Sequence, residues 1–172
     1  KLLQRIFLKM RIIDLFSGVG GLTFGFYYRK YKDHFVRNRK NQFVFANEYN
    51  PFAAKAYSEN YPDIPMKNCD IKSLKESDIR KWIGSEPVDL IIGGPPCQSF
   101  STVGQRNYDE KAQLYTEYLR VLKIARPKMF LFENVRGILS MREIFYKRDA
   151  AGNILYELKD VEGRESLTPR KK

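Results

Sequence analysis

Short apolar runs alternate along the chain with amphipathic stretches, a pattern typical of α/β proteins. Continuous apolar runs indicate strands buried on both faces of a sheet. They predict strands at residues 10–16, 42–47, 68–71, 88–93 and 128–133. Helices are predicted between them, at residues 22–30, 77–83 and 111–125 and after Asn50-Pro51, because Asn caps helices and Pro suits the first turn. The alternation predicts an open, doubly wound, mostly parallel sheet.

Two further segments complete this division of the chain. The basic segment 31–41 is predicted to be a loop or a helix end. After residue 140 the pattern weakens, and apolar triplets at 144–146 and 154–156 flank a polar segment that contains Gly, which predicts a hairpin. We therefore expect an N-terminal extension at 1–9, a domain at 10–140, and a hairpin-like segment with a polar tail at 141–172.

Charge and composition narrow the classes of partner. The formal net charge is +11, which favours a polyanion such as nucleic acid, although solubility alone also explains it. The basic segment 29–40 is either a phosphate contact or a solvated loop. No apolar run is long enough to span a bilayer and no signal peptide is recognisable, so we expect no membrane partner and a cytoplasmic location. Cys69 and Cys97 lack Cys-x-x-Cys spacing, so neither a disulfide framework nor a metal site is expected.

A glycine-rich loop follows the first predicted strand. Gly18, Gly20 and Gly21 form Gly-x-Gly-Gly rather than the dinucleotide fingerprint, which argues against a pyrophosphate ligand. Glu48 ends the second strand, where a carboxylate can accept ribose hydroxyls, and Asp70 ends the third, where it can accept from an adenine amino group. A nucleoside ligand without a phosphate cradle is implied, and S-adenosylmethionine fits this description.

Two reactive side chains follow the next two strands. Cys97 stands on the Pro95-Pro96 turn just after an apolar strand, where open α/β sheets place ligands and chemistry. The alternative is an inert, buried cysteine. Glu133 leaves the following strand at the same predicted edge and is expected to be partly desolvated; its alternative roles are a helix cap or a salt bridge.

These motifs, in this order, resemble those of the cytosine-C5 DNA methyltransferases of bacterial restriction-modification systems. The resemblance covers about residues 11–140 and rests on the segment Asp14 to Gly21, the run Pro95-Pro96-Cys97-Gln98-Ser99-Phe100-Ser101, and Glu133-Asn134-Val135. It implies a Rossmann-like, S-adenosylmethionine-dependent methyltransferase fold. It also implies that these residues bind the cofactor: Phe16, Gly18, Gly20, Gly21, Leu22, Glu48, Tyr49, Asp70, Ile71, Pro95 and Leu114. Tyr49, Asp70 and Ile71 would lie at the adenine.

The resemblance also implies a reaction and a partner. Cys97 would add to C6 of a cytosine flipped out of double-stranded DNA, and Glu133 would bind the same base while C5 takes the methyl group. These residues would face the DNA: Gln98, Ser99, Ser101, Arg106 and Lys111. A solvated loop is an equal alternative for Arg106 and Lys111. An enzyme of this kind would be associated with the nucleoid.

The chain departs from the family pattern in its later part. We find no Gln-Arg-Arg triplet, no target-recognition domain and no final conserved segment. We therefore expect a partial sequence, a truncated gene or one half of a split enzyme whose second polypeptide carries target recognition. A tRNA cytosine-C5 methyltransferase and a non-catalytic cofactor- or DNA-binding remnant remain alternatives. A nicotinamide-dependent oxidoreductase is disfavoured by the glycine spacing and the Pro-Pro-Cys turn.

Overall fold

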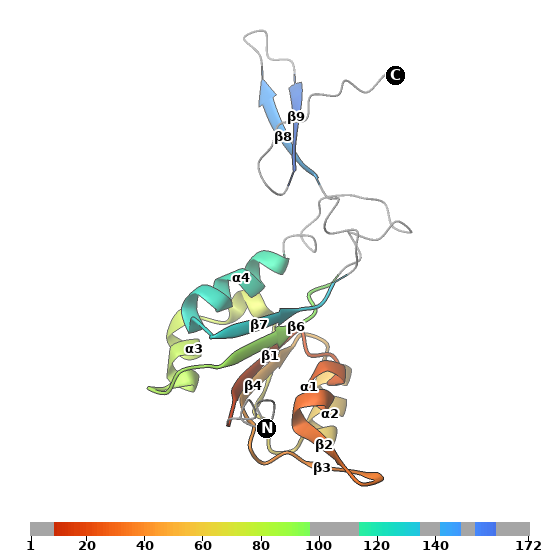
Figure 1. The fold of residues 1–172 in the computed structure, drawn as a ribbon. Coiled ribbons are helices and arrows are strands. Elements are labelled where there is room, and N and C mark those ends of the chain that lie inside the picture. The colour runs from red at the N-terminus through yellow and green to blue at the C-terminus, as the bar shows by residue number, and fades with distance from the viewer. Residues whose placement is uncertain (1–8, 97–113, 135–141, 149–153, 161–172) are drawn as a thin grey trace, which may run out of the picture. The chain divides into compact units, whose positions relative to one another are not determined.

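A computed structural model describes residues 9–96, 114–134, 142–148 and 154–160. Elements β1 to β7 belong to one compact unit, and β8 and β9 belong to a second. The first unit contains a five-stranded sheet in the order β5-β4-β1-β6-β7, with every neighbouring pair parallel (Figure 1). The strands are β1 (Arg11–Leu15), β4 (Gln42–Glu48), β5 (Met66–Asn68), β6 (Leu90–Gly93) and β7 (Met129–Phe132). The predicted doubly wound parallel sheet is confirmed.

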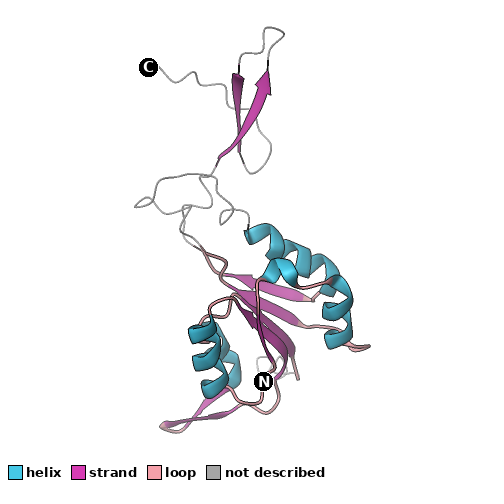
Figure 2. Cartoon of the chain, turned by 180° about the vertical axis from the view of Figure 1, so that it is seen from behind, coloured by secondary structure: helices cyan, strands magenta, loops and turns pink. Residues whose placement is uncertain are grey.

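Helices cover both faces of this sheet. Helices α1 (Gly21–Tyr27) and α2 (Pro51–Asn60) lie on one face, and α3 (Glu76–Ile83) and α4 (Leu114–Ala125) on the other, as the two opposite views show (Figures 1 and 2). Helix α2 begins as predicted, because Asn50 Oδ1 accepts hydrogen bonds from Phe52 N at 2.9 Å and Ala53 N at 3.2 Å. The predicted helix 111–125 is described from Leu114 onward.

The central strands contain continuous apolar runs because successive side chains enter two different cores. Ile12 belongs to the core under α1 and α2, whereas Ile13 belongs to the core under α3 and α4. Ile91 and Ile92 of β6 divide in the same way, and all four side chains are fully buried. A parallel sheet buried on both faces therefore requires continuous apolar runs rather than alternation.

A close approach of three elements fixes the end of β6. The Tyr118 hydroxyl of α4 lies 3.1 Å from Ile91 O and 3.1 Å from Leu131 O, which belong to neighbouring strands. A Cβ atom at Gly93 would lie 2.5 Å from Leu15 O and 2.9 Å from the Tyr118 ring. Only glycine fits there, so the chain that leaves β6 is held directly against β1 and α4.

Three predictions about secondary structure are wrong. The helix predicted at 22–30 ends at Tyr27, and the predicted loop 31–41 contains a hairpin of β2 (Tyr28–Tyr31) and β3 (His34–Arg37). Aromatic packing of the hairpin on α1 supports the strand conformation, since the Phe35 and Phe24 ring centroids lie 5.1 Å apart. The third strand is β5, at 66–68 rather than 68–71.

Asp70 therefore does not end a strand. Its Oδ1 accepts from Lys72 N at 2.9 Å, and this cap starts the short 3₁₀ helix η2 (Ile71–Ser73). The residue that sequence reasoning assigned to a strand end caps a helical turn instead, still beyond the carboxyl end of β5.

The second unit contains an antiparallel hairpin of β8 (Arg142–Arg148) and β9 (Ile154–Asp160). It confirms the hairpin predicted around 144–146 and 154–156 and extends both strands. In the described parts of the chain, no helix is long and apolar enough to cross a membrane.

Candidate active site

The carboxyl ends of the strands meet at one edge of the first unit. Register pairs Leu15 with both Asn47 and Gly93, and Gly93 with Phe132. The segments that follow the strands therefore line this edge in sheet order: Asp70, Glu48, the glycine-rich loop, Pro95-Pro96 and Glu133. This is the topological switch point, where β1 lies between β4 and β6 and where doubly wound proteins bind ligands.

The glycine-rich loop packs against Tyr61 at Gly20 and faces open space at Gly18. Gly20 has φ 96°, and a Cβ atom there would lie 2.1 Å from the Tyr61 ring, so this position requires glycine. The Tyr61 hydroxyl donates to Gly20 O at 2.7 Å. At Gly18, by contrast, a Cβ atom would meet nothing within 4 Å, so the loop backbone faces open space there.

Glu48 is fixed by backbone donors from two loops. Its Oε2 accepts from Gly18 N at 2.8 Å and its Oε1 accepts from Asn50 N at 2.7 Å. The Asn68 amide donates to Glu48 O at 2.8 Å and to Tyr49 O at 3.1 Å, which fixes the backbone on either side of Tyr49. A carboxylate oxygen has two lone pairs, so both oxygens keep acceptor capacity for a ligand.

Exposed apolar side chains surround this carboxylate. Tyr49 is 74% exposed, Phe52 is 83% exposed and Val19 is 57% exposed. Large apolar groups in solvent at a strand-end loop are typical of a ligand rim. Sequence reasoning selected Tyr49 but missed Phe52 and Val19, because an aromatic in the first turn of a helix gives no signal of its exposure.

Other predicted cofactor residues lie deeper. Ile71 is only 3% exposed and belongs to the core on the α3 and α4 face, and Phe16 and Leu114 pack against that same core. Pro95 is buried and Leu22 packs against the opposite core. Apart from Pro95, these residues lie in the two cores or pack against them, beneath the loops of the carboxyl edge, whereas Asp70 is exposed to solvent.

Helix α4 is tied to the η2 turn through one arginine. The Arg120 guanidinium donates to Ile71 O at 2.9 Å and to Leu74 O at 3.0 Å, and its Nε donates to Glu117 Oε2 at 2.7 Å. The carbonyl groups at either end of η2 are thereby bound to α4. Sequence reasoning did not identify this link.

A buried polar cluster underlies the glycine-rich loop. Asp14 is fully buried and accepts a hydrogen bond from the Thr23 hydroxyl, which lies 2.8 Å from the Tyr57 hydroxyl. Burial raises the pKa of Asp14 to about 7, the hydrogen bond from Thr23 opposes this rise, and the charge of Glu48 adds to it. Within the described residues, Asp14 Oδ1 and the Ser17 hydroxyl are buried without a hydrogen-bond partner.

Glu133 lies against the segment that leads to Cys97. Its backbone N donates to Gly93 O at 2.9 Å, and a Cβ atom at Gly94 would lie 2.9 Å from Glu133 Oε2. The missing side chain at Gly94 leaves room for this carboxylate. The expected partial desolvation of Glu133 is wrong, because the side chain is exposed. Cys97 and the predicted DNA-facing residues lie outside the described residues: Gln98, Ser99, Ser101, Arg106 and Lys111.

A search of the described residues for three or more clustered His, Cys, Asp or Glu side chains finds no such group. The polar groups at the edge are instead carboxylates that accept hydrogen bonds from backbone N–H groups, with glycines beside them. An open doubly wound sheet with these features at its switch point defines an α/β protein of the class that binds ligands at the carboxyl ends of its strands.

Comparison with protein families identifies the family to which the chain belongs within this class of fold. The family model for the C-5 cytosine-specific DNA methylase matches residues 10–161, and the chain belongs to that family. The match includes every residue that the sequence motifs selected.

Similar proteins support this assignment. The chain is 42% identical over 135 residues to the Type II methyltransferase M.AgeI of Thalassovita gelatinovora. The matched region covers 77% of this chain and 29% of that protein. It is 36% identical over 137 residues to M.AquIA of Picosynechococcus, which covers 77% of this chain and 51% of that protein. The chain thus spans about a third to a half of the length of these relatives.

Solved structures give the same result. A prophage-encoded E. coli protein described as a DNA modification methyltransferase superposes with a TM-score of 0.60 and 29% identity, covering 79% of this chain and 39% of the other. DNMT2 of Spodoptera frugiperda superposes with a TM-score of 0.55 and 27% identity, covering 77% of this chain and 37% of the other.

Proposed function

We propose that this protein transfers a methyl group from S-adenosylmethionine to C5 of a cytosine in double-stranded DNA, as the modification enzyme of a restriction-modification system. One observation carries the proposal. Glu133 lies against Gly94, at the start of the turn that leads to Cys97, and the loop fixed by Glu48 is at the same sheet edge. Membership of the cytosine-C5 methylase family supports assigning these groups to that chemistry.

The edge fits S-adenosylmethionine by its donors and acceptors. The free lone pairs of Glu48 suit ribose hydroxyls, and the exposed Tyr49 ring suits an adenine face. Asp14 Oδ1 and the Ser17 hydroxyl are buried oxygens without a partner in the described chain, and both can accept from an ammonium group. The bound cofactor would supply an electrophilic methyl group.

The remaining cofactor assignments are proposed from the motif. The glycine-rich loop and the residue after it would lie along the cofactor, with contacts from Phe16, Gly18, Gly20, Gly21 and Leu22. Asp70 and Ile71 would bound the adenine, and Pro95 and Leu114 would close the pocket. The exposed position of Asp70 and the open space at Gly18 support these roles.

The chemistry uses two residues of this chain. The Cys97 thiolate forms a bond to C6 of cytosine, and the electrons of the C5–C6 double bond move toward C5, which becomes nucleophilic. Glu133 hydrogen-bonds the N3 and exocyclic amine side of the ring and stabilises the added base. After C5 has taken the methyl group, the C5 proton is lost, the double bond forms again and Cys97 is released.

The base must leave the helix to reach this site. An enzyme that reacts at C5 and C6 cannot reach a stacked cytosine, so the target is flipped out of the duplex. Gln98, Ser99 and Ser101 would face the DNA beside the nucleophile, and Arg106 and Lys111 would contact phosphates. We assign residues 10–140 to the catalytic domain.

Covalent trapping tests the proposal directly. Duplex DNA in which 5-fluorocytosine replaces cytosine throughout requires no knowledge of the target sequence, since fluorine blocks release of the enzyme. With S-adenosylmethionine present, the wild type and Cys69→Ser should form an adduct stable to denaturation, whereas Cys97→Ser should form none. Cys69 is a matched control because it is the free, half-buried cysteine among the described residues.

The same experiment separates the alternatives. An adduct that persists in Cys97→Ser would remove the assigned nucleophile. Trapping on 5-fluorocytosine tRNA but not on DNA would move the substrate from DNA to tRNA. Binding of S-adenosylmethionine, measured by calorimetry, should be equal in all three proteins; binding without any adduct would make the chain a cofactor-binding remnant.

A further inference from the structure

The β2–β3 hairpin has one face that points away from the rest of its unit. Residues directly opposite each other in an antiparallel pair share a face. The face that carries Phe35 packs on Phe24 of α1. The other face carries Arg29, Tyr31, His34 and Val36. The functional assignments above make no use of this second face.

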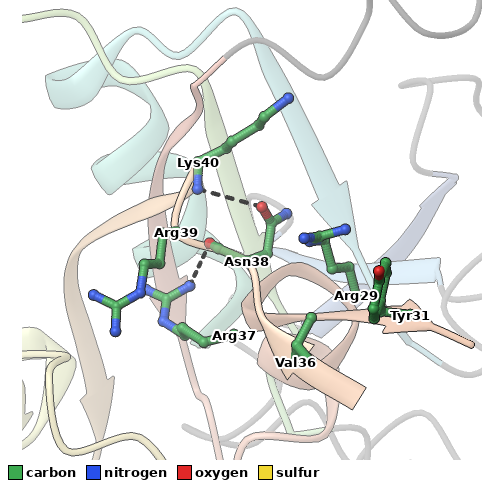
Figure 3. A pocket seen from close by; sticks show the side chains of 7 residues that line it. All are labelled: Arg29, Tyr31, Val36, Arg37, Asn38, Arg39 and Lys40. Carbon is green, nitrogen blue, oxygen red and sulfur yellow. Dashed lines mark hydrogen bonds between the residues drawn. The ribbon is translucent and has the colours of Figure 1, made fainter. Parts of the chain in front are cut away.

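This outer face lines a hollow of about 1020 Å³ together with the turn that follows β3. The hairpin contributes Arg29, Tyr31 and Val36, and the turn contributes the segment from Asn38 to Lys40 (Figure 3). Figure 3 shows Arg29 and Tyr31 next to each other on β2, with Val36 on the neighbouring strand. The hollow is thus lined by cationic side chains and by one aromatic ring, which lies beside Arg29 (Figure 3).

Arg37 gives the turn its shape. Its guanidinium lies 3.7 Å from the centroid of the Tyr27 ring, pairs with Asp63 at 3.0 Å, and donates to Asn38 O at 2.6 Å. Asn38 is buried, and its Oδ1 accepts from Lys40 N at 3.3 Å. Arg37 is therefore occupied by contacts within the protein, and these contacts fix the turn that carries Arg39 and Lys40.

The other cations of the hollow are available to a ligand. Arg29, Arg39 and Lys40 are exposed, and none of them has an ion pair with another residue of the described chain. The Arg29 guanidinium lies 5.7 Å from the centroid of the Tyr31 ring, which is 54% exposed. Three cations without an ion pair in the described chain favour a polyanion, and arginine guanidinium groups suit phosphate because they can donate two parallel hydrogen bonds to it.

The hollow is not part of the candidate active site. Helix α1 starts at the glycine-rich loop on the carboxyl edge and ends at Tyr27, where the hairpin begins. The turn then leads into Gln42 at the start of β4, whose N donates to Met10 O at 2.8 Å. The hairpin therefore lies at the amino edge, and its cations cannot contact the phosphates that flank a cytosine bound at the opposite edge.

We propose that the β2–β3 hairpin and its following turn form a second nucleic-acid contact, which binds the phosphate backbone without reading bases. It would hold DNA that is remote from the target cytosine, either a distant part of the same molecule or another duplex. The proposal goes beyond methyl transfer and does not depend on it. An acidic protein surface is the competing partner, and the net charge of +11 together with membership of a DNA methylase family favours DNA over it.

The test uses the full chain and a labelled dA–dT duplex of about 30 base pairs, long enough to bind through several phosphates. This duplex holds no cytosine, so its binding is independent of the proposed reaction, and S-adenosylmethionine is left out. Affinity is measured by fluorescence anisotropy over a range of salt concentrations. The first variant combines Arg29→Gln, Arg39→Gln and Lys40→Gln. The matched control combines Lys55→Gln, Lys75→Gln and Lys81→Gln, which remove the same charge from exposed positions elsewhere.

The hairpin variant should bind about tenfold more weakly at low salt, and the slope of log affinity against log salt should fall by about 2 to 3, since each lost phosphate contact removes roughly 0.9 from it. The control should keep the wild-type slope and stay within about twofold in affinity. A second variant that keeps the charge, Arg29→Lys with Arg39→Lys, should bind as the wild type does, and urea denaturation of the glutamine variant should match that of the wild type.

Three results would overturn the proposal. Equal losses in the hairpin variant and the control would show that only total charge matters. Unchanged binding by the hairpin variant would place the contact elsewhere. Displacement of the wild-type protein from DNA by poly-glutamate at an equal concentration of charge, without such competition in the hairpin variant, would identify an acidic protein as the partner.

Discussion

The two halves of the carboxyl edge are built differently. On the β4 side, backbone and side-chain groups fix each loop, as in the hydrogen bonds from Gly18 N and Asn50 N to Glu48. On the β7 side, the strand that precedes Glu133 is apolar but exposed: Met129 is 54% exposed and Phe130 is 61% exposed. The proposed cofactor loops are therefore preorganised by their own neighbours, whereas the strand that carries the proposed base-binding carboxylate is covered much less.

This difference teaches that binding and chemistry belong to separable parts of the edge. A site with fixed donors loses little entropy when a ligand arrives, so the β4 side should bind the cofactor without help from the β7 side. Substitutions on the two sides should then have different readouts. The following predictions test this separation, beginning with the largest expected effect.

The largest effect should come from Gly20→Ala. A Cβ atom there would meet the Tyr61 ring at 2.1 Å in a backbone of φ 96°, so the loop or α2 must move. We expect a loss of about 4 kcal/mol in unfolding free energy and no measurable cofactor binding. Urea denaturation and calorimetry with S-adenosylmethionine provide the two measurements.

Gly25→Ala is the matched control for that substitution. Gly25 lies inside α1 and a Cβ atom there would meet nothing within 4 Å, so alanine should stabilise the protein by about 0.5 to 1 kcal/mol. If Gly20→Ala were as stable as Gly25→Ala, the contact between the glycine-rich loop and Tyr61 would not define the cofactor side.

A smaller effect, dependent on pH, should come from Asp14→Asn. Because burial raises the pKa of Asp14 from 3.8 to about 7, the folded protein binds a proton that the unfolded chain releases. The contribution of this residue is therefore most favourable below pH 4 and falls as pH rises to 7. An asparagine side chain does not titrate, so Asp14→Asn should be more stable than the wild type by about 2 kcal/mol at pH 8, with the difference shrinking toward pH 4.

Asp89→Asn should change the free energy of unfolding in the opposite direction, measured by the same denaturation at several pH values. The hydrogen bond from Lys128, at 2.6 Å, lowers the pKa of Asp89, and this stabilisation is present at neutral pH and is lost as pH falls through the folded pKa. Asp89→Asn should be less stable than the wild type at pH 7 and equal to it in acid. Parallel pH profiles for the two variants would contradict the assignment at Asp14.

A change in cofactor affinity separates the two sides most sharply. Glu48→Gln replaces the carboxylate that accepts hydrogen bonds from Gly18 N and Asn50 N with a neutral amide. The substitution should weaken binding of S-adenosylmethionine about tenfold, or roughly 1.4 kcal/mol. Glu133→Gln should leave that affinity unchanged and reduce covalent trapping on 5-fluorocytosine DNA. If both substitutions weakened cofactor binding equally, the conclusion that the β4 side binds the cofactor without help from the β7 side would be wrong.

The sheet could be predicted from the sequence because its signal is local. Runs such as Leu90 to Ile92 are apolar throughout, and a strand between two helical layers requires that pattern. The β2–β3 hairpin could not be predicted, because its turn at Lys32 and Asp33 lacks the Asn-Gly or Gly signal of a tight hairpin, although Lys32 adopts φ 52°. Its strands are held by packing of Phe35 on Phe24, which is a tertiary contact.

The candidate site divides in the same way. Glu48 and the glycine-rich loop could be predicted as neighbours, since the ends of parallel strands meet at one edge. The contact between Gly20 and Tyr61 joins residues 41 positions apart, and the support of Tyr49 O by Asn68 spans 19 positions. A local pattern does not indicate such pairings, so Tyr61, Asn68 and Arg120 were missed, whereas the residues of the sequence motifs were found.

The hydrogen bonds of Arg120 have a practical consequence for protein engineering. They bind α4 to both ends of η2, so the helix and the turn behave as a single exchangeable module rather than two. A chimera that imports an α4 without an arginine at position 120 would remove the side-chain donors of Ile71 O and Leu74 O, and Ile71 O would keep only its bond from Leu74 N at 3.2 Å. Grafts with boundaries before Asp70 and after Ala125 would keep that module whole.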